Sequence, residues 1–531
     1  MYTIGIDFGT LSARAVLVDT LTGEVASSHA CAYPHGVLTE SLPTGEPLPA
    51  DWALQHPADY LYALRDAVTG VTAASGVRAD EVCGLALDVT ASTLMPTDAE
   101  LTPLCLTEAF AGEKHAWVKL WKHHGAQRDA DRITERFPDR LSTYGGRANA
   151  EWAIPKIMET LREAPDMYRA AARFIEAGDW LVSRLTGCET RALCAAGFKY
   201  FYDPIAGVYP GAAFFAALDP ALADLQEKLG PAPVRQEKCA GHLTREAAEW
   251  LGLTENTAVA PAHVDAHAGI SAAGCVSEGQ LLMNIGTSSC HMLLSDRQVA
   301  VKGISGSVPD GAFTGTVCYE AGQSAVGDSF EWALSAFGGD AGHAEMTARA
   351  EKLRPGESGL IALDWLGGNR SVLANADLTG LILGLTPRTK PGEIYRALLE
   401  STAFGARRIL EAFTDAGLPV DSAVAAGGIS RKNSLLTQIY ADVLGLPVSV
   451  AEAPYGAALG SAIFAAVSAG VYPSVPEAVR RMTKPAVRTV EPIPENVRAY
   501  EKLYGIYKKL HDSFGSNGIM EELTLMRRQL R

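Results

Sequence analysis

The sequence lacks any run that approaches 18 uncharged apolar residues, and it lacks closely spaced cysteine pairs. The first absence predicts no membrane-spanning helix, because crossing a bilayer takes about 20 consecutive apolar residues. Asp7 and Arg14 interrupt the only apolar stretch near the N-terminus, so we expect no secretory signal peptide. The nine cysteines form no CxxC pair and are odd in number, which favours reduced thiols in a cytoplasmic protein over a disulfide framework or a zinc site.

Basic residues are also scarce. The chain carries 46 Lys and Arg against 61 Asp and Glu, a formal net charge of -15. Because phosphate backbones are bound by clustered Lys and Arg, we expect no nucleic-acid partner. A small phosphorylated ligand remains compatible, since a few backbone amides can hold it. The 531 residues, 47% hydrophobic and 20% charged, predict a folded chain with more than one core.

A short pattern occurs twice. Residues 8–12, FGTLS, and residues 285–289, IGTSS, share the order apolar-Gly-Thr-x-Ser, and each copy joins two strand-like runs. One such copy is typical of an ordinary hairpin. Two copies, nearly 280 residues apart, indicate a chain built from two related halves.

The pattern of elements supports this division. Strand-like and helix-like segments alternate in the first half and repeat in the second, which predicts an α/β layer architecture. Residues 105–260 are rich in helix formers and are expected to form an insert beside the first sheet, and a helix at 456–470 has small residues on more than one face, which predicts tight packing. We therefore expect lobes at 1–275 and 276–495 and a helical tail at 496–531.

The two copies have the composition of phosphate loops. A loop that holds a polyphosphate needs close backbone N–H groups, hydroxyls and an acid for magnesium. Facing copies, one from each half, would hold the β- and γ-phosphates of a nucleotide across a cleft. The predicted phosphate-binding residues are Gly9, Thr10, Ser12, Arg14, Gly286 and Thr287, and the predicted magnesium ligand is Asp7.

A third glycine-rich corner lies at 423–436, where a strand is followed by a helix. Gly427 and Gly428 leave room for a flat adenine or ribose, and Asn433 can hydrogen-bond to it. Alone, this stretch is typical of a strand-turn-helix corner. Following the two phosphate loops, it predicts the adenosine site.

These stretches resemble the FGGY carbohydrate kinases, within the wider actin-like ATPase superfamily. The resemblance runs from Tyr2 to about Arg480 and is strongest in DFGT at 7–10, IGTS at 285–288, AGG at 426–428 and GLILGLTPRTKPGEIYRALLEST at 380–402. It implies an α/β fold of two lobes with ribonuclease-H-like cores and a cleft between them. It further implies ATP and Mg²⁺ as cofactors and transfer of the γ-phosphate to a sugar or polyol hydroxyl.

Asp265 is the candidate general base. Phosphoryl transfer to an alcohol needs a carboxylate that takes the hydroxyl proton, and Asp265 is the only carboxylate in the apolar stretch 258–276. It could also cap a helix, and both roles can hold together. The resemblance assigns the base to this position, with Asp265 as a second magnesium contact. His263 and His267 are expected to pack near it, since Mg²⁺ prefers oxygen ligands.

Further stretches of the sequence indicate the acceptor pocket. They resemble most the ketopentose branch of the family and lie at 88–96, 115–124, 196–201, 318–334 and 363–380. The resemblance implies sugar contacts from Ala91, Trp121, Lys199, Asp265 and Glu320. Trp121 would offer an apolar wall, and the charged groups would fix hydroxyls or a carbonyl. Alternatively, Trp121 belongs to the core, Lys199 is solvated and Glu320 is a surface acid.

One departure from the family pattern narrows the choice of acceptor sugar. Many family members have Trp-x-Asp-x-Arg where this chain has Trp121-Lys122-His123-His124, so sugar contacts of the glycerol and xylulose kinases cannot be carried over. The roles of His123 and His124 stay open. We expect phosphorylation of the C5 hydroxyl of L-ribulose; D-ribulose, ribitol or L-xylulose are alternative acceptors, and a non-enzymatic nucleotide-gated binding protein is a further alternative. A homodimer is also expected.

Overall fold

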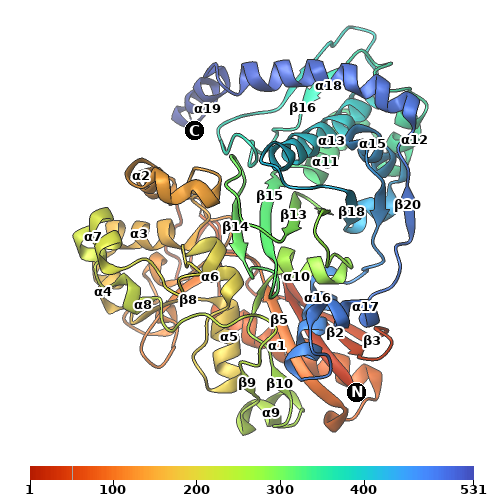
Figure 1. The fold of residues 1–531 in the computed structure, drawn as a ribbon. Coiled ribbons are helices and arrows are strands. Elements are labelled where there is room, and N and C mark those ends of the chain that lie inside the picture. The colour runs from red at the N-terminus through yellow and green to blue at the C-terminus, as the bar shows by residue number, and fades with distance from the viewer. Residues whose placement is uncertain (51, 531) are drawn as a thin grey trace.

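The computed structural model describes residues 1–50 and 52–530. Its first large sheet is made almost entirely by the N-terminal quarter of the chain and the stretch before residue 265 (Figure 1). The first three strands in spatial order run antiparallel to one another, and the two strands that follow run parallel to the third. In spatial order they are β3 (Val25–Ala32), β2 (Ser12–Asp19), β1 (Tyr2–Phe8), β5 (Val82–Val89), β10 (Ala258–Val259) and β9 (Gly241–His242), with β11 (His263–Val264) also on β5.

The second sheet repeats this order. Its antiparallel strands, four here, are again followed by two strands parallel to the last of them, so β12 occupies the place of β1 and β18 the place of β5. This arrangement confirms the predicted α/β fold with two related cores. In order the strands are β14 (Gly306–Pro309), β15 (Val317–Gln323), β13 (Ser289–Ser295), β12 (Gln280–Ile285), β18 (Ser422–Ala426), β19 (Val448–Val450) and β20 (Arg488–Val490).

Amphipathic helices cover the sheets because their apolar faces need a partner. On the first sheet α1 (Pro57–Ser75) begins at the His56 cap and ends at Gly76, whose φ of 68° suits a left-handed C-terminal turn. On the second sheet lie α13 (Pro391–Asp415), α14 (Gly428–Lys432) and α15 (Ser434–Leu444). Outside them, α11 (Gly327–Ala333), α12 (His343–Glu351) and the two-stranded sheet of β16 (Ile361–Leu363) and β17 (Leu381–Leu383) pack on α13. The last two helices are α18 (Pro494–Phe514) and α19 (Ile519–Gln529).

The insert lies beside the first sheet and has its own aromatic-rich core (Figure 1). A small sheet runs through it, in the order β4 (Leu54–Gln55), β7 (Val118–Lys119), β6 (Leu94–Thr97) and β8 (Arg173–Glu176). Its helices and those that border it are α2 (Gln127–Arg136), α3 (Ala153–Glu163), α4 (Pro165–Ala170), α5 (Ala177–Thr186), α6 (Leu193–Lys199), α7 (Ala212–Leu218), α8 (Leu225–Lys228) and α9 (Arg245–Leu251).

One helix crosses from the second half to the first. The helix α16 (Gly456–Ser468), which is followed by α17 (Val475–Met482), packs on β1, β5 and α10 (Asp265–Ala272). A Cβ on Gly5 would lie 1.9 Å from the carbonyl oxygen of Ala458, so only glycine admits this approach. The predicted tight packing is present, and it joins the two halves through a shared layer.

Across the described residues, no helix combines the length and the apolar character that crossing a bilayer requires. The cysteines all lie in this part of the chain, and none of the nine forms a disulfide.

Candidate active site

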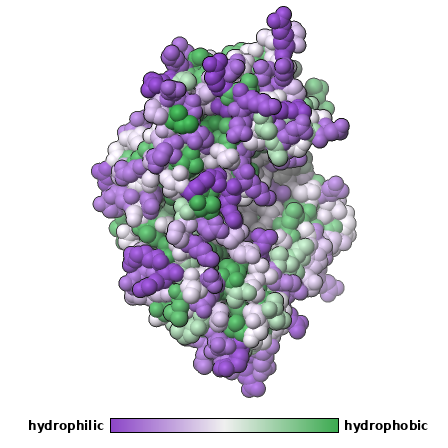
Figure 2. Space-filling model, turned by 90° about the vertical axis from the view of Figure 1, so that its right-hand side faces the viewer, coloured by the Kyte–Doolittle hydropathy of each residue, from purple (hydrophilic) through white to green (hydrophobic). Residues whose placement is uncertain are grey.

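A cavity of about 170 Å³ lies between the two sheets and takes residues from both halves of the chain. Figure 2 shows a hollow at about mid-height in one face of the molecule. A cavity of this size suits one small ligand. The five predicted sugar contacts all line it: Ala91, Trp121, Lys199, Asp265 and Glu320.

Three carboxylates lie at the carboxyl edge of the first sheet. Asp7 and Asp88 are register partners on β1 and β5, and Asp265 begins α10 directly after β11. Asp88 is fully buried and accepts a hydrogen bond of 2.6 Å from Ser461 of α16. Arg14 stands opposite Asp7 on β2 and its charge favours the ionised form of that acid. Asp88 was not predicted, although LALD at 85–88 ends a strand in an acid just as IGID does at 4–7.

These carboxylates are electrostatically strained. Burial raises the pKa of Asp7, and burial together with the charge of Asp7 raises the pKa of Asp88 well above its usual range. Burial, followed by the charge of Asp7, raises the pKa of Asp265 to about 7. A cation beside them would relieve this repulsion. Their oxygens do not converge into a trio within 4.8 Å.

Lys199 and Glu320 form an ion pair between the two halves. Lys199, the last residue of α6, places its Nζ 2.9 and 3.1 Å from the two carboxylate oxygens of Glu320 on β15. Both side chains are largely buried. Burial opposes ionisation of Glu320, but Lys199 and then His267 lower the pKa of its carboxyl. The pair therefore presents a fixed donor and a fixed acceptor to the cavity.

Trp121 links the cavity to the first loop. Its indole Nε1 donates to the Thr10 hydroxyl at 3.1 Å, while Gln55 donates to the Thr10 carbonyl at 2.7 Å. The Tyr33 hydroxyl donates to the carbonyl of Gly9 at 3.0 Å. The loop is thus held from three directions, and Trp121 has a polar role besides the apolar wall predicted for it.

Each loop is closed by a hydrogen bond from its glycine amide, to a carbonyl three residues further on in the first loop and two residues further on in the second. The N–H of Gly9 donates to Ser12 at 3.0 Å, and the N–H of Gly286 donates to Ser288 at 2.9 Å. Since both glycine amides are used inside the turn, a phosphate would meet the hydroxyls and the following amides. A Cβ on either glycine would touch only ordinary van der Waals neighbours. The second loop is tied to the start of α11, where Val326 donates to the Thr287 carbonyl at 2.9 Å.

At the third corner, Gly427 and Asn433 have structural roles in addition to the nucleotide contacts predicted for them. Gly427 has a φ of 98°, and a Cβ there would lie 2.3 Å from the carbonyl oxygen of Ile285. Gly428 faces open space. Asn433 caps α15, because its Oδ1 accepts from Leu436 at 3.0 Å, while its Nδ2 donates to Thr347 at 3.3 Å. Gly428 thus offers the free surface at this corner.

Other cavity residues were not predicted, namely Thr90, Ser92, Glu151, Trp152, Cys290 and Arg370. Glu151 and Arg370 come from opposite halves, with 3.6 Å between Oε1 and the guanidinium. Burial opposes ionisation of Glu151, but Arg370 and His124 lower the pKa of its carboxyl to about 2. Arg370 lies in the stretch 363–380 described above, whereas Glu151 lies in none of those stretches, and only the fold brings the two irregular segments together.

The histidines with open roles now have locations. His123 is buried and bonded to Glu159 at 2.8 Å, which is a structural position. His124 is half exposed and lies 3.4 Å from Glu151. Burial lowers the pKa of His263 to about 3 and of His267 to about 4, so both are neutral at pH 7.

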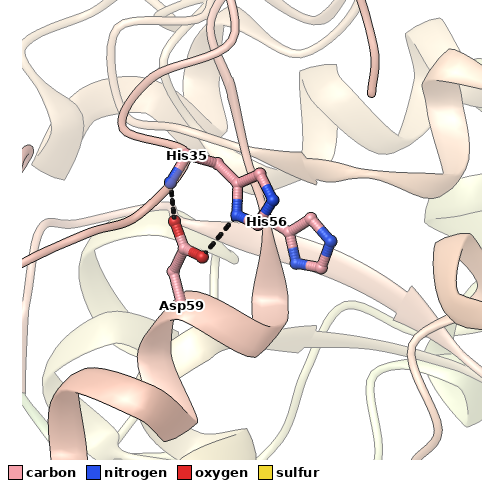
Figure 3. A group of neighbouring side chains, drawn as sticks. All are labelled: His35, His56 and Asp59. Carbon is pink, nitrogen blue, oxygen red and sulfur yellow. Dashed lines mark hydrogen bonds and ion pairs between the residues drawn. The ribbon is translucent and has the colours of Figure 1, made fainter. Parts of the chain in front are cut away.

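A further group, His35, His56 and Asp59, lies at the start of α1 (Figure 3). His35 is bonded to Asp59 twice, through its backbone N–H at 2.9 Å and through Nδ1 at 2.7 Å. His56 accepts the N–H of Ala58 and stacks on His35 with 4.3 Å between ring centroids. Imidazole lone pairs lie in the ring plane, so two stacked rings do not aim at one ion. We interpret the group as a hydrogen-bonded helix cap.

A larger cavity of about 380 Å³ lies beside the ends of α10 and α17 and the strand β19. Arg480 and Lys484 line it but are mostly exposed. It contains none of the loop or carboxylate residues described above.

Two ribonuclease-H-like sheets, each with a Gly-Thr turn after its first strand, enclose a carboxylate-bearing pocket, and this combination is typical of a kinase of the actin-like ATPase fold. Family models bear this out: the N-terminal domain of the FGGY family of carbohydrate kinases matches residues 2–271, and the C-terminal domain matches residues 281–469. The chain belongs to the FGGY family of carbohydrate kinases and is an enzyme that phosphorylates a sugar with ATP.

Individual relatives agree. A ribulokinase of Geobacillus thermodenitrificans is 48% identical over 98% of this chain and 96% of its own length. A ribulokinase of Mycolicibacterium smegmatis is 44% identical over 99% and 96%. Among solved structures, the ligand-bound xylulose kinase of Lactobacillus acidophilus matches with a TM-score of 0.84 over 97% of this chain and 99% of that one; at 18% identity it supports the fold alone.

Proposed function

We propose that this enzyme transfers the γ-phosphate of ATP to the C5 hydroxyl of L-ribulose, giving L-ribulose 5-phosphate in L-arabinose catabolism. The observation that carries the proposal is the single cavity shared by Asp265, Lys199, Glu320, Trp121 and Ala91. The relatives called ribulokinase, similar over nearly their whole length, support the choice of sugar.

In this mechanism Asp265 accepts the proton of the C5 hydroxyl as the O–H bond breaks. The C5 oxygen then bonds to the γ-phosphorus, the bond from that phosphorus to the β-bridging oxygen breaks, and ADP leaves. Lys199 and Glu320 hold the carbonyl or hydroxyls at the other end of the sugar, and Trp121 packs on its C–H face. Closure of the two lobes would exclude water as a competing acceptor.

Residues of the two loops and the third corner would bind the nucleotide. We assign its phosphates to the hydroxyls of Thr10 and Thr287, with Ser12 and Arg14 nearby, and its adenosine to the surface at Gly428. Mg²⁺, when bound, neutralises phosphate charge. The carboxylate oxygens of Asp7, Asp88 and Asp265 would bind that ion. One buried oxygen of Asp88 has no hydrogen-bond partner and is therefore available to it.

A reducing cytoplasm as the site of action is part of the proposal, supported by the unpaired cysteines. So is a homodimer, which sedimentation would test.

A coupled ADP-release assay with L-ribulose, D-ribulose, ribitol and L-xylulose tests the acceptor. We expect the highest kcat/KM with L-ribulose and little ADP release without sugar. A higher kcat/KM with another member of the panel would replace L-ribulose by that sugar and leave the chemistry in place. Sugar-independent ATP hydrolysis at the same rate would remove the acceptor site altogether.

A further inference from the structure

A buried lysine joins the two segments that carry Ala91 and Trp121. Lys156 of α3 is 0% exposed, and its Nζ donates to the backbone carbonyls of Ser92 and Leu120, each at 2.8 Å. Ser92 directly follows Ala91, and Leu120 directly precedes Trp121. One ammonium group therefore spans the two walls of the cavity.

The first of these segments is strained and needs support. Ser92 has a φ of 54°, in the left-handed region that a residue with a side chain rarely adopts. Its hydroxyl is buried without a hydrogen-bond partner. Nearby, Thr93 donates to the carbonyl of Thr90 at 2.7 Å, which closes the turn but leaves the Ser92 carbonyl to Lys156. Without the ammonium this buried carbonyl would lose the partner seen here.

The charge environment of Lys156 differs from that of its neighbour Lys119. Lys119 is also buried, but it pairs with Glu159 at 2.6 Å. In the described part of the chain, Lys156 has no carboxylate within ion-pair distance, although Glu176 and Glu151 lie near enough to favour its charge. Burial lowers the pKa of Lys156 to about 7. Burying an amine without a paired carboxylate is unfavourable, so fold stability alone does not account for Lys156.

We propose that Lys156 is a positioning residue that fixes the gap between Ala91 and Trp121 and thereby the fit of the acceptor sugar. The inference rests on the proposed sugar site but does not depend on which sugar occupies it. Lys156 itself does not line the cavity, so it acts through the carbonyls it holds.

The test compares Lys156→Met with Lys119→Met in the full-length enzyme. Both changes remove one buried amine from the same region, but Lys119 holds Glu159, Thr160 and the carbonyl of residue 156 rather than the cavity walls. For Lys156→Met we expect the KM for the sugar to rise about tenfold or more, with the KM for ATP within about twofold of the unmutated enzyme. For Lys119→Met we expect a lower Tm with the sugar KM unchanged.

An unchanged sugar KM in Lys156→Met, or an equal rise in Lys119→Met, would overturn the positioning role. Should Lys156→Met not fold, Lys156→Arg and Lys156→Gln are compared instead: Arg keeps charge and donors, and Gln is too short to span both carbonyls. We then expect the lower sugar KM in Lys156→Arg, and equal values would overturn the proposal. The comparison uses whichever sugar of the panel is turned over fastest, so failure of L-ribulose as acceptor is seen separately, in the unmutated enzyme.

Discussion

Replacing Asp265 by Asn should abolish most turnover while making the unliganded protein more stable above neutral pH. The kinetic part follows from the role of the base, whose loss typically lowers the rate by about 10² to 10⁴-fold. The stability part follows from the pKa of about 7 that burial and Asp7 impose on this carboxyl, against an ordinary value of 3.8. The ionised acid that the reaction requires at this position therefore lowers the free energy of unfolding.

The sign and size of the stability change follow from proton linkage. Below about pH 4 the carboxyl is protonated in both the folded and the unfolded chain, so it contributes no difference. As the pH rises to about 7, the unfolded chain loses this proton first, and the folded state is progressively disfavoured. Above pH 7 the full difference between 3.8 and about 7 applies, which corresponds to at most about 4 kcal/mol.

Urea unfolding of the metal-free and nucleotide-free protein at pH 4.5 and pH 8 measures this effect. We expect Asp265→Asn to be more stable than the unmutated protein at pH 8 and to have lost most of that advantage at pH 4.5. Coupled ADP release measured over pH 6 to 9 tests the kinetic part of the prediction. We expect turnover to fall on the acid side (the acid limb) with a midpoint at or below pH 7, because a bound cation favours the ionised form of Asp265.

Glu320→Gln is the matched control, since its negative charge also raises the pKa of Asp265. We expect this variant to keep the acid limb and shift it to lower pH. Full turnover in Asp265→Asn, or an acid limb that persists in its residual activity, would refute the assignment of the base. A variant that is less stable at pH 8 would refute the electrostatic reasoning.

Three further substitutions test the site and its support. Lys199→Met should raise the sugar KM by about tenfold with the ATP KM unchanged, and equal effects on both constants would speak against a sugar contact. Gly5→Ala should lower the free energy of unfolding by several kcal/mol or prevent folding, because its Cβ would lie 1.9 Å from the Ala458 carbonyl; a neutral result in urea unfolding would contradict the close packing. Ser461→Ala should cost about 1 to 3 kcal/mol by leaving Asp88 without its hydrogen bond, measured as a lower urea midpoint at pH 7.

Local patterns in the sequence were sufficient to predict the fold. Alternating strand and helix signals gave the α/β layers, and the two apolar-Gly-Thr-x-Ser copies correspond to the turns β1–β2 and β12–β13. Such patterns succeed because they reflect contacts between neighbours in the chain. The strand order then follows from repeating one compact unit twice.

The cavity was only partly predictable. Residues inside motifs, such as Lys199 and Glu320, could be found from the sequence because neighbouring residues mark them. Arg370 also lies in such a stretch, at 363–380, but its pairing with Glu151 could not be predicted, since more than 200 residues separate the two and only tertiary packing sets their spacing of 3.6 Å. The hydrogen-bonding role of Trp121 was missed for the same reason: its partner, Thr10, is 111 positions away.

The packing of α16 against Gly5 has a consequence for how the chain is made. The strands β1 and β5 leave the ribosome long before the helix that covers them, so the first sheet cannot complete its core until most of the protein has been synthesised. Until then, the apolar face that α16 later buries is open to chaperones or to other nascent chains. We therefore expect the fragments 1–275 and 276–531 to be insoluble when each is produced alone. Activity should be recovered only when both are produced in the same cell.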